Sequence, residues 1–362
     1  MRGNLFSVVY EVANAMYGGA GADARIAELQ SSVHQEIAGE KEDVPLHYLL
    51  FKLTNRCNSD CEYCSHAVSN TANEAKSDIP LELVQKTIAE AGALGATAMA
   101  INGGEPLVRE DVLDIVRTTV DNGIVPVLMT NGILLPKYWR SLGDAGLRYA
   151  IISFDSIRPE IYEKQRGQSF EQALAGIKAA QNMMEEFPGT HVHATAVLTR
   201  DNVNDFIDLV KFMSERGIPV QISPHHHYMN RKPDKISIED RAEIEALTER
   251  LLRMKHEEGY LVANSTGFIE HLTEFFADRR RIPADYRCEV GYTNLFIDAY
   301  GNVHPCWDRR FKPLGKLGQT SLEEIWHGEL MQEYRRRMLE CDCDGCWYMC
   351  TGEVSMLLDG RL

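Results

Sequence analysis

Apolar residues along this chain fall into two kinds of segment that alternate. Six short runs are almost continuously apolar, and they lie at 47–54, 96–103, 125–132, 149–156, 191–199 and 219–224. The segments between them carry apolar residues at helical spacing, and most end in glycine, a common helix stop; they lie at 80–95, 109–123, 136–146, 169–187 and 202–217. The pattern predicts six strands that alternate with helices.

Apolar strands that are joined by helices form parallel sheets with helices on their outer faces. Six such units suit a partial barrel better than a closed eight-stranded one. We therefore predict an α/β fold, a partial (β/α)6 barrel with a parallel sheet, plus a small cysteine-rich C-terminal domain. Functional residues in such folds gather at the carboxyl ends of the strands, so the residues after each predicted strand are the first candidates.

Composition narrows the class of protein. A chain of 362 residues with 44% hydrophobic and 25% charged content can bury a large core. Its net charge of -15 argues against a nucleic-acid partner, which requires clustered Lys and Arg. The sequence has no run of about 18 apolar residues and no clear signal peptide, so we expect a cytoplasmic protein without a membrane partner.

Nine cysteines are distributed unevenly along the chain. Cys57, Cys61 and Cys64 directly follow the first predicted strand, none falls between 65 and 287, and six lie between 288 and 350. Because cytosolic thiols stay reduced, metal binding or catalysis explains them better than disulfides do. A zinc site here would have to borrow a remote fourth ligand. Three thiolates can instead hold three irons of a 4Fe–4S cluster and leave one iron open to another ligand.

The spacing CxxxCxxC, with Tyr63 before the last cysteine, resembles the signature of the radical S-adenosylmethionine (SAM) superfamily. The resemblance covers roughly residues 46 to 225. It implies a SAM-binding 4Fe–4S cluster at Cys57, Cys61 and Cys64, and reductive cleavage of SAM to methionine and a 5'-deoxyadenosyl radical. It also implies an electron donor such as flavodoxin or ferredoxin.

Further motifs follow the second, third and fourth predicted strands. NGGEP resembles the GGEP motif of the family, whose backbone and glutamate would engage the amino group of SAM; MTNG and SFDS resemble polar strand ends that contact SAM. The candidate SAM-binding residues are therefore Tyr63 of the cysteine motif together with Gly103, Gly104, Glu105, Pro106, Asn131, Ser153 and Asp155. For the last three, a role in a turn or a helix cap is an open alternative.

The six C-terminal cysteines form a second cysteine-rich region, and they are Cys288, Cys306, Cys341, Cys343, Cys346 and Cys350. Between the first two, DAYGN predicts a hairpin turn between two short strands. The pattern resembles the SPASM or twitch extensions of radical SAM enzymes, which bind auxiliary iron–sulfur clusters. A full SPASM unit has seven cysteines, whereas this chain has six, so we expect one or two auxiliary 4Fe–4S clusters. We expect one of them to join Cys288 and Cys306 to the last four cysteines.

These patterns divide the chain into four expected segments. They are an N-terminal helical extension (1–45), the radical SAM partial barrel (46–235), a helical connector (236–285) and the SPASM/twitch-like auxiliary cluster domain (286–362). The sequence SPHHHYMN follows the sixth strand, which makes His225, His226 and His227 candidate catalytic residues that could bind substrate, move a proton or ligate iron.

The sequence predicts a radical SAM oxidoreductase or lyase. Only about 45 residues precede the first strand, which is short for the peptide-recognition domain of peptide-modifying members, so we expect a small polar biosynthetic intermediate of aminocyclitol, sugar or nucleoside type. Oxidation or dehydration is the expected outcome. A maturase of ribosomally made peptides and an epimerase remain alternatives, and a purely electron-transferring or scaffold protein would have no need of GGEP beside an open iron site.

Overall fold

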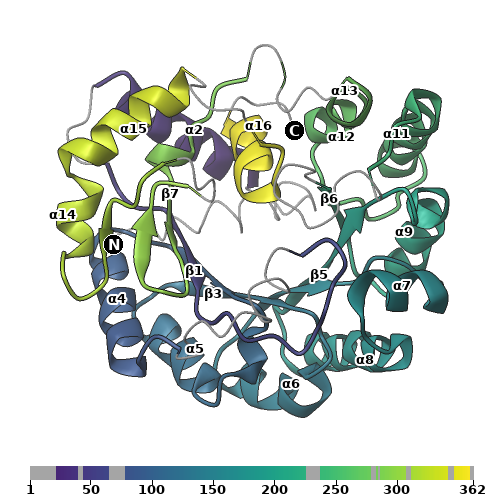
Figure 1. The fold of residues 1–362 in the computed structure, drawn as a ribbon, viewed down its shortest axis with the longest axis horizontal. Helices are drawn as coiled ribbons and strands as arrows, with labels where there is room; N and C mark the ends of the chain where they lie inside the picture. The colour runs from purple at the N-terminus through teal and green to yellow at the C-terminus, as the bar shows by residue number, and fades with distance from the viewer. Residues whose placement is uncertain are drawn as a thin grey trace.

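The computed structural model describes residues 22–39, 44–64, 78–225, 237–278, 283, 286–306, 311–340 and 346–358. Its centre is a sheet in which six parallel strands lie in the order β6-β5-β4-β3-β2-β1 (Figure 1). They are β1 (Tyr48–Lys52), β2 (Ala98–Asn102), β3 (Val125–Thr130), β4 (Tyr149–Ser153), β5 (His191–Leu198) and β6 (Val220–Pro224). Each strand lies within one of the six apolar runs, so the predicted parallel α/β sheet is confirmed.

Helices cover the outer face of this sheet. Those that correspond to the predicted helical segments are α4 (Leu81–Ala93), α5 (Val112–Asp121), α6 (Leu135–Asp144), α8 (Phe170–Glu186) and α9 (Phe206–Ser214), with short turns η1 (Pro106–Val108) and η2 (Val203–Asp205). A further helix, α7 (Pro159–Arg166), is not predicted, because its sequence PEIYEKQR is too short and too polar to show helical periodicity. It begins with proline at its first position and ends at Gly167, whose φ is 62°.

The two faces of the barrel sheet differ in how tightly they are filled. The outward residues of β5, such as Ala194 and Ala196, are buried beneath the helices in the main core. The inward residues of β1, Tyr48 and Leu50, are buried against Phe296. On β4, β5 and β6, by contrast, the inward positions are more accessible than the buried outward positions with which they alternate. The accessible inner wall of the barrel therefore lies along β4, β5 and β6.

The C-terminal hairpin extends the same sheet. β7 (Asn294–Ile297) pairs in parallel with β1, β8 (Asn302–His304) pairs antiparallel with β7, and β9 (Gly315–Lys316) pairs antiparallel with β8. The hairpin predicted at DAYGN is confirmed, and Asp298 holds its turn by accepting hydrogen bonds from the backbone N–H groups of Tyr300 and Asn302. The cysteine-rich C-terminal region is thus continuous with the barrel sheet.

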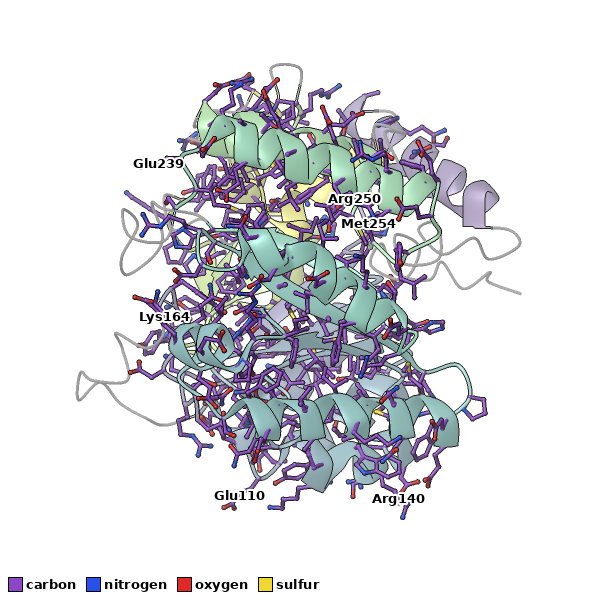
Figure 2. All side chains as sticks on the ribbon, turned by 90° about the vertical axis from the view of Figure 1, so that its right-hand side faces the viewer. Glu110, Arg140, Lys164, Glu239, Arg250 and Met254 are labelled. Carbon is purple, nitrogen blue, oxygen red and sulfur yellow. The ribbon has the colours of Figure 1, made fainter. Side chains whose placement is uncertain are left out.

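The remaining helices flank the C-terminal strands and the β6 edge. α11 (Arg241–His256), α12 (Thr266–Glu270) and α13 (Leu272–Ala277) follow β6, and Figure 2 shows α11 from the side, with Arg250 and Met254 on it and Lys164 on α7. The C-terminal region adds η3 (Val290–Tyr292), α14 (Leu322–Trp326), α15 (Glu329–Leu339), η4 (Met349–Glu353) and α16 (Val354–Leu358). The N-terminal helix α2 (Ala22–Ile37) contacts α16 and η3.

The edge of β6 that faces away from β5 is linked to the C-terminal segment. The side chain of Asn264 bonds both the backbone N–H and the carbonyl of Ile222, as a neighbouring strand would. Next to it, the backbone N–H of Ser265 donates to the carboxylate of Glu353 at the end of η4. In Figure 1, α16 accordingly lies between β7 and β6. The C-terminal segment therefore covers the side of the barrel that the six strands leave open.

Candidate functional site

Three cysteines lie on the loop that follows β1. Cys61 is buried, Cys57 and Cys64 are half-buried, and none of the three forms a disulfide. Burial raises the pKa of Cys61 to about 12 and also raises the pKa of Cys57, and the nearby Cys64 adds to both shifts. The thiols are therefore neighbours in a desolvated loop, and a bound cationic centre would keep them in the thiolate form.

This donor set fits an iron–sulfur cluster. Soft thiolates are the ligands of iron–sulfur clusters and of zinc. Among the residues that the structure describes, no three His, Cys, Asp or Glu side chains converge on a site for a single metal ion. Cluster cysteines need not converge in this way, because each binds a different iron. The loop after β1 thus offers three thiols for a 4Fe–4S cluster and leaves its fourth iron open.

The glycine pair after β2 packs against the cysteine loop itself. A side-chain carbon on Gly104 would overlap the carbonyl group of Arg56, and one on Gly103 would lie 2.8 Å from the carbonyl oxygen of Thr54. The backbone N–H of Gly104 donates to Thr54 (2.8 Å), and that of Glu105 donates to Arg56 (2.9 Å). The sequence predicts that these glycines admit a ligand, whereas in the structure the group that approaches them closely is the backbone of the cysteine loop.

The carboxylate of Glu105 faces the protein interior. It is completely buried, and it accepts hydrogen bonds from the backbone N–H groups of Leu107 and Asn131 and from the hydroxyl of Thr130. Burial raises the pKa of Glu105, and these three hydrogen bonds oppose the shift. The side chain links the end of β2 to the end of β3. Pro106 is buried beside it, so the backbone is the part of this loop that can face a ligand.

The polar candidates at the ends of β3 and β4 have different surroundings. The side chain of Asn131 donates to Oδ1 of Asn58 (2.7 Å) and to Oγ of Ser59 (2.9 Å), both on the cysteine loop. Ser153 ends β4 at an inward, half-buried position. Asn131 therefore holds the cysteine loop in place, while Ser153 forms part of the accessible inner wall of the barrel.

Asp155 is fully buried and its carboxylate accepts four hydrogen bonds. The hydroxyl of Tyr63 donates at 2.5 Å, Arg166 donates from Nε (2.6 Å) and Nη2 (2.8 Å), and the backbone N–H of Val197 donates at 2.8 Å. The resemblance implies a contact between Asp155 and SAM. In the structure this carboxylate holds Tyr63, which is itself buried between the second and third cysteines of the loop, and the contact with SAM stays a prediction.

Arg166 is a site residue that sequence reasoning misses. It is 6% exposed, although an arginine in the last turn of a polar helix usually points into solvent. Burial lowers the pKa of Arg166, while the charge of Asp155 raises it. The resulting pKa lies well above the ordinary value of arginine. The only local signal is Gly167, which indicates a helix end but gives no hint of what the arginine contacts.

Of the three candidate histidines, His225 is buried directly after β6, while His226 and His227 lie outside the described residues. A histidine that sequence reasoning misses, His193, occupies an inward position of β5. Burial lowers the pKa of His193 to about 4, so the imidazole is neutral at physiological pH. The alternation of His191, His193 and Thr195 in the strand pattern could have identified this inward face.

The described C-terminal cysteines fall into two pairs. Cys288 and Cys306 pack around one apolar cluster that contains Phe311. Cys350 packs against the inward cluster of Tyr48 and Leu50, and burial, with a smaller contribution from nearby Cys346, raises its pKa to about 12. Cys341 and Cys343 lie outside the described residues. The expectation that one cluster joins Cys288 and Cys306 to the last cysteines stays a prediction.

Two family models match the chain. The model described as the Radical SAM superfamily matches residues 51–213, and the model described as an iron-sulfur cluster-binding domain, SPASM, matches residues 288–347. Among the residues that the structure describes, no helix is long and apolar enough to cross a membrane.

Curated relatives differ in how much of the chain they match. GTP 3',8-cyclase of Alkaliphilus oremlandii is 32% identical over 45% of this chain and 52% of that enzyme, so the chain spans about half of that relative. The probable GTP 3',8-cyclase of Methanocaldococcus jannaschii is 30% identical over 54% of this chain and 67% of that protein. AdoMet-dependent heme synthase of Methanosarcina barkeri is 26% identical over 84% of this chain and 90% of that enzyme.

Solved structures share the fold. SuiB of Streptococcus suis bound to S-adenosylmethionine superposes with a TM-score of 0.63 at 18% identity, covering 88% of this chain and 74% of that one. The enzyme anSMEcpe with bound AdoMet gives a TM-score of 0.62 at 16% identity, covering 82% and 86%. At this level of identity, the likeness establishes the architecture that both domains of the chain share with these proteins.

Proposed function

Because this chain belongs to the radical SAM superfamily and carries a SPASM iron–sulfur domain, we propose that it oxidises or dehydrates a small polar molecule inside its barrel. Cys57, Cys61 and Cys64 would hold the SAM-binding 4Fe–4S cluster. When bound, that cluster supplies the electron that cleaves SAM to methionine and the hydrogen-abstracting 5'-deoxyadenosyl radical. Members of the superfamily also need an electron donor.

The observation that carries the substrate class is the chemistry of the inner wall. The polar inward positions of β4, β5 and β6 include Ser153, His193, Thr195, Gln221 and Ser223. None of the inward residues of these three described strands is Asp, Glu, Lys or Arg, and the imidazole of His193 is neutral. Hydroxyl, amide and imidazole groups orient a substrate through hydrogen bonds, so the wall suits a molecule that is rich in hydroxyl or amide groups.

The chain's own residues would keep water away from the reacting carbon and hold it in one orientation. The apolar inward residues Tyr48, Leu50 and Phe296 fill much of the β1 side of the barrel. The inward position at the carboxyl end of β1 is the buried Lys52, and the polar β4–β6 wall is left for the substrate. Cys350 packs against the same apolar cluster. An auxiliary cluster held partly by Cys350 would supply an electron acceptor on the side of the barrel opposite the polar wall.

The first test is SAM cleavage by protein that has been reconstituted anaerobically with iron and sulfide. With a strong reductant, we expect 5'-deoxyadenosine, measured by liquid chromatography. A panel of neutral sugars, aminocyclitols and nucleosides is then searched by mass spectrometry for a product lighter by two hydrogens or by one water, formed in proportion to 5'-deoxyadenosine. If reconstituted wild-type protein forms no 5'-deoxyadenosine, the proposed activity is wrong.

A pair of variants tests the inner wall. Thr195→Val removes an inward hydroxyl without changing the side-chain size. Thr190→Val makes the same change at a buried position just before the N-terminal end of β5. We expect Thr195→Val to lower product formation more than tenfold with unchanged substrate-free SAM cleavage. Thr190→Val should leave product formation within twofold of wild type. Equal effects of the two variants would contradict a substrate site on this wall.

A second candidate is synthesis of a heme-type macrocycle. It is favoured by the heme synthase relative, which aligns along nearly the whole of this chain, unlike the cyclases. Heme formation from a porphyrin precursor, followed by visible absorbance, would distinguish it from chemistry on a small polar molecule. Peptide maturation stays a further alternative, and a library of peptides assayed by mass spectrometry tests it under the same conditions.

Epimerisation requires a hydrogen donor, usually a thiol, and no cysteine lies between residues 65 and 287. Cys350, which packs against the inward cluster, is a described thiol that could serve if it is not a cluster ligand. Thiols exchange their hydrogen with solvent. We expect no deuterium at an inverted carbon when the reaction runs in deuterated water, and a product of unchanged formula with one such deuterium would support an epimerase.

A further inference from the structure

The C-terminal end of α7 sits directly on the cysteine loop. The backbone carbonyl of Gln165 accepts a hydrogen bond from the N–H of Glu62 (2.8 Å), and the side chain of Gln168 donates to the carbonyl of Asn58 (3.3 Å). Between them, a side-chain carbon on Gly167 would lie 3.0 Å from the carbonyl oxygen of Asp60. These contacts place Arg166, the last residue of α7, on the buried side of the cysteine loop.

Arg166 and Asp155 form a buried ion pair beside the cysteines. The guanidinium of Arg166 lies over the ring of Tyr63, 5.3 Å from its centre, and the Tyr63 hydroxyl bonds the same carboxylate oxygen as Arg166 Nε. Both charges act on the thiol of Cys61, where Arg166 favours the anionic form and Asp155 disfavours it. Since neither partner is exposed to solvent, neither water nor salt screens these effects strongly.

Reduction of an iron–sulfur cluster adds one electron to a group that already carries thiolate charge. A buried cation nearby stabilises the reduced form, and a buried anion destabilises it, so local charge and hydrogen bonding set the reduction potential. In the native pair the two charges largely offset each other. Removal of either one leaves the other uncompensated within the same desolvated region.

We propose that Asp155 and Arg166 are positioning residues that hold the Cys61–Cys64 half of the loop through Tyr63 and that set the reduction potential of the cluster by their opposed charges. This inference rests on the proposed ligation of the cluster by the three loop cysteines. The role assigned to Asp155 is to support the cysteine loop through Tyr63, and it is separate from any contact with SAM. Arg166 acts on the cluster through space and through the ring of Tyr63.

The test measures the midpoint potential of the loop cluster in reconstituted full-length protein without SAM, by redox titration with electron paramagnetic resonance. At the potential that half-reduces the wild-type cluster, Asp155→Asn should be more than half reduced and Arg166→Gln less than half reduced. The double variant, which removes both charges, should lie between the single variants. Glu186→Gln, which removes one charge from the exposed Arg140–Glu186 ion pair on the surface, is the control and should not move the potential.

Two further measurements separate the possible failures. Hydrogen–deuterium exchange of the iron-free protein should show faster exchange at residues 57–64 in both single variants but not in the control, whether or not a variant later takes up iron. Shifts of the same sign, or unchanged potentials and unchanged exchange, would overturn the inference. If the low-potential signal survives replacement of Cys57, Cys61 and Cys64 by alanine, the proposed ligation itself is wrong, and the comparison of Asp155 with Arg166 fails with it.

Discussion

Gly104 is the position where a single methyl group should separate the two loops of the proposed SAM site. In Gly104→Ala, the new carbon would overlap the carbonyl oxygen of Arg56, and it would lie 2.8 Å from the carbonyl carbon of Arg56 and 2.9 Å from the carbonyl oxygen of Asn55. All three neighbours are backbone atoms, which cannot rotate away as a flexible side chain could. The loop after β2 must therefore move away from the cysteine loop.

The size of this effect follows from the contacts. A carbon and a carbonyl oxygen approach no closer than about 3.3 Å, so the loops must separate by roughly 1 Å. Such a shift stretches the bonds from Gly104 N–H to Thr54 (2.8 Å) and from Glu105 N–H to Arg56 (2.9 Å), each worth about 0.5–1.5 kcal/mol. Overpacking adds about 1–3 kcal/mol. We expect a loss of about 2–6 kcal/mol of unfolding free energy.

Two assays check this prediction. Urea denaturation should report the loss of stability, and equilibrium dialysis should report weaker SAM binding by reconstituted protein. Gly123→Ala is the control, because Gly123 has a φ of 73° and open space around it, in the turn before β3. It should cost about 1–2 kcal/mol through backbone strain alone and leave SAM affinity unchanged.

The reasoning would be refuted if Gly104→Ala kept the wild-type urea midpoint and SAM affinity. A loss of stability equal to that of Gly123→Ala, with normal SAM affinity, would also refute it. That second outcome would show that the loops can separate without disturbing the site.

Four further predictions concern iron, the cysteines, histidine titration and the core. Alanine at Cys57, Cys61 and Cys64 together should abolish 5'-deoxyadenosine formation while auxiliary iron stays bound, measured by chromatography and iron analysis. Iron content should be about eight per chain with one auxiliary cluster or about twelve with two, and about four would contradict the C-terminal assignment. Because burial lowers the pKa of His193 to about 4 while the unfolded chain protonates near its ordinary value of 6.5, stability should fall as pH drops from about 6.5 to about 4, and less so in His193→Gln by urea denaturation. Trp347 is fully buried, stacks on a phenylalanine ring at 5.0 Å and donates to a backbone carbonyl, so Trp347→Ala should lose about 3–5 kcal/mol by the same method.

Much of the site could be predicted from the sequence because each candidate follows a strand. Parallel strands end at the same edge of a sheet, so the cysteine loop after β1, Gly103 and Gly104 after β2 and Asn131 after β3 had to meet there. Hydrogen bonds now link these three segments directly. What local pattern could not give is the direction of each side chain. The side chain of Asp155, after β4, contacts Tyr63 of the cysteine loop, and the side chain of Glu105 contacts Thr130 and Asn131 at the end of β3.

The sequence by itself determined the alternation of strands and helices, the hairpin near residue 300 and the location of the cysteine loop. Each of these depends on periodicity or turn residues within a short window, which the chain carries locally. Tertiary structure alone decided that β7 joins β1 in parallel, that Arg166 is buried beside the cysteines and that Cys350 reaches the inward cluster. These contacts join segments that are far apart in sequence. Sheet register and the free-energy cost of leaving a buried charge unpaired decide which of these segments meet. Neither can be predicted from a single short segment of the sequence.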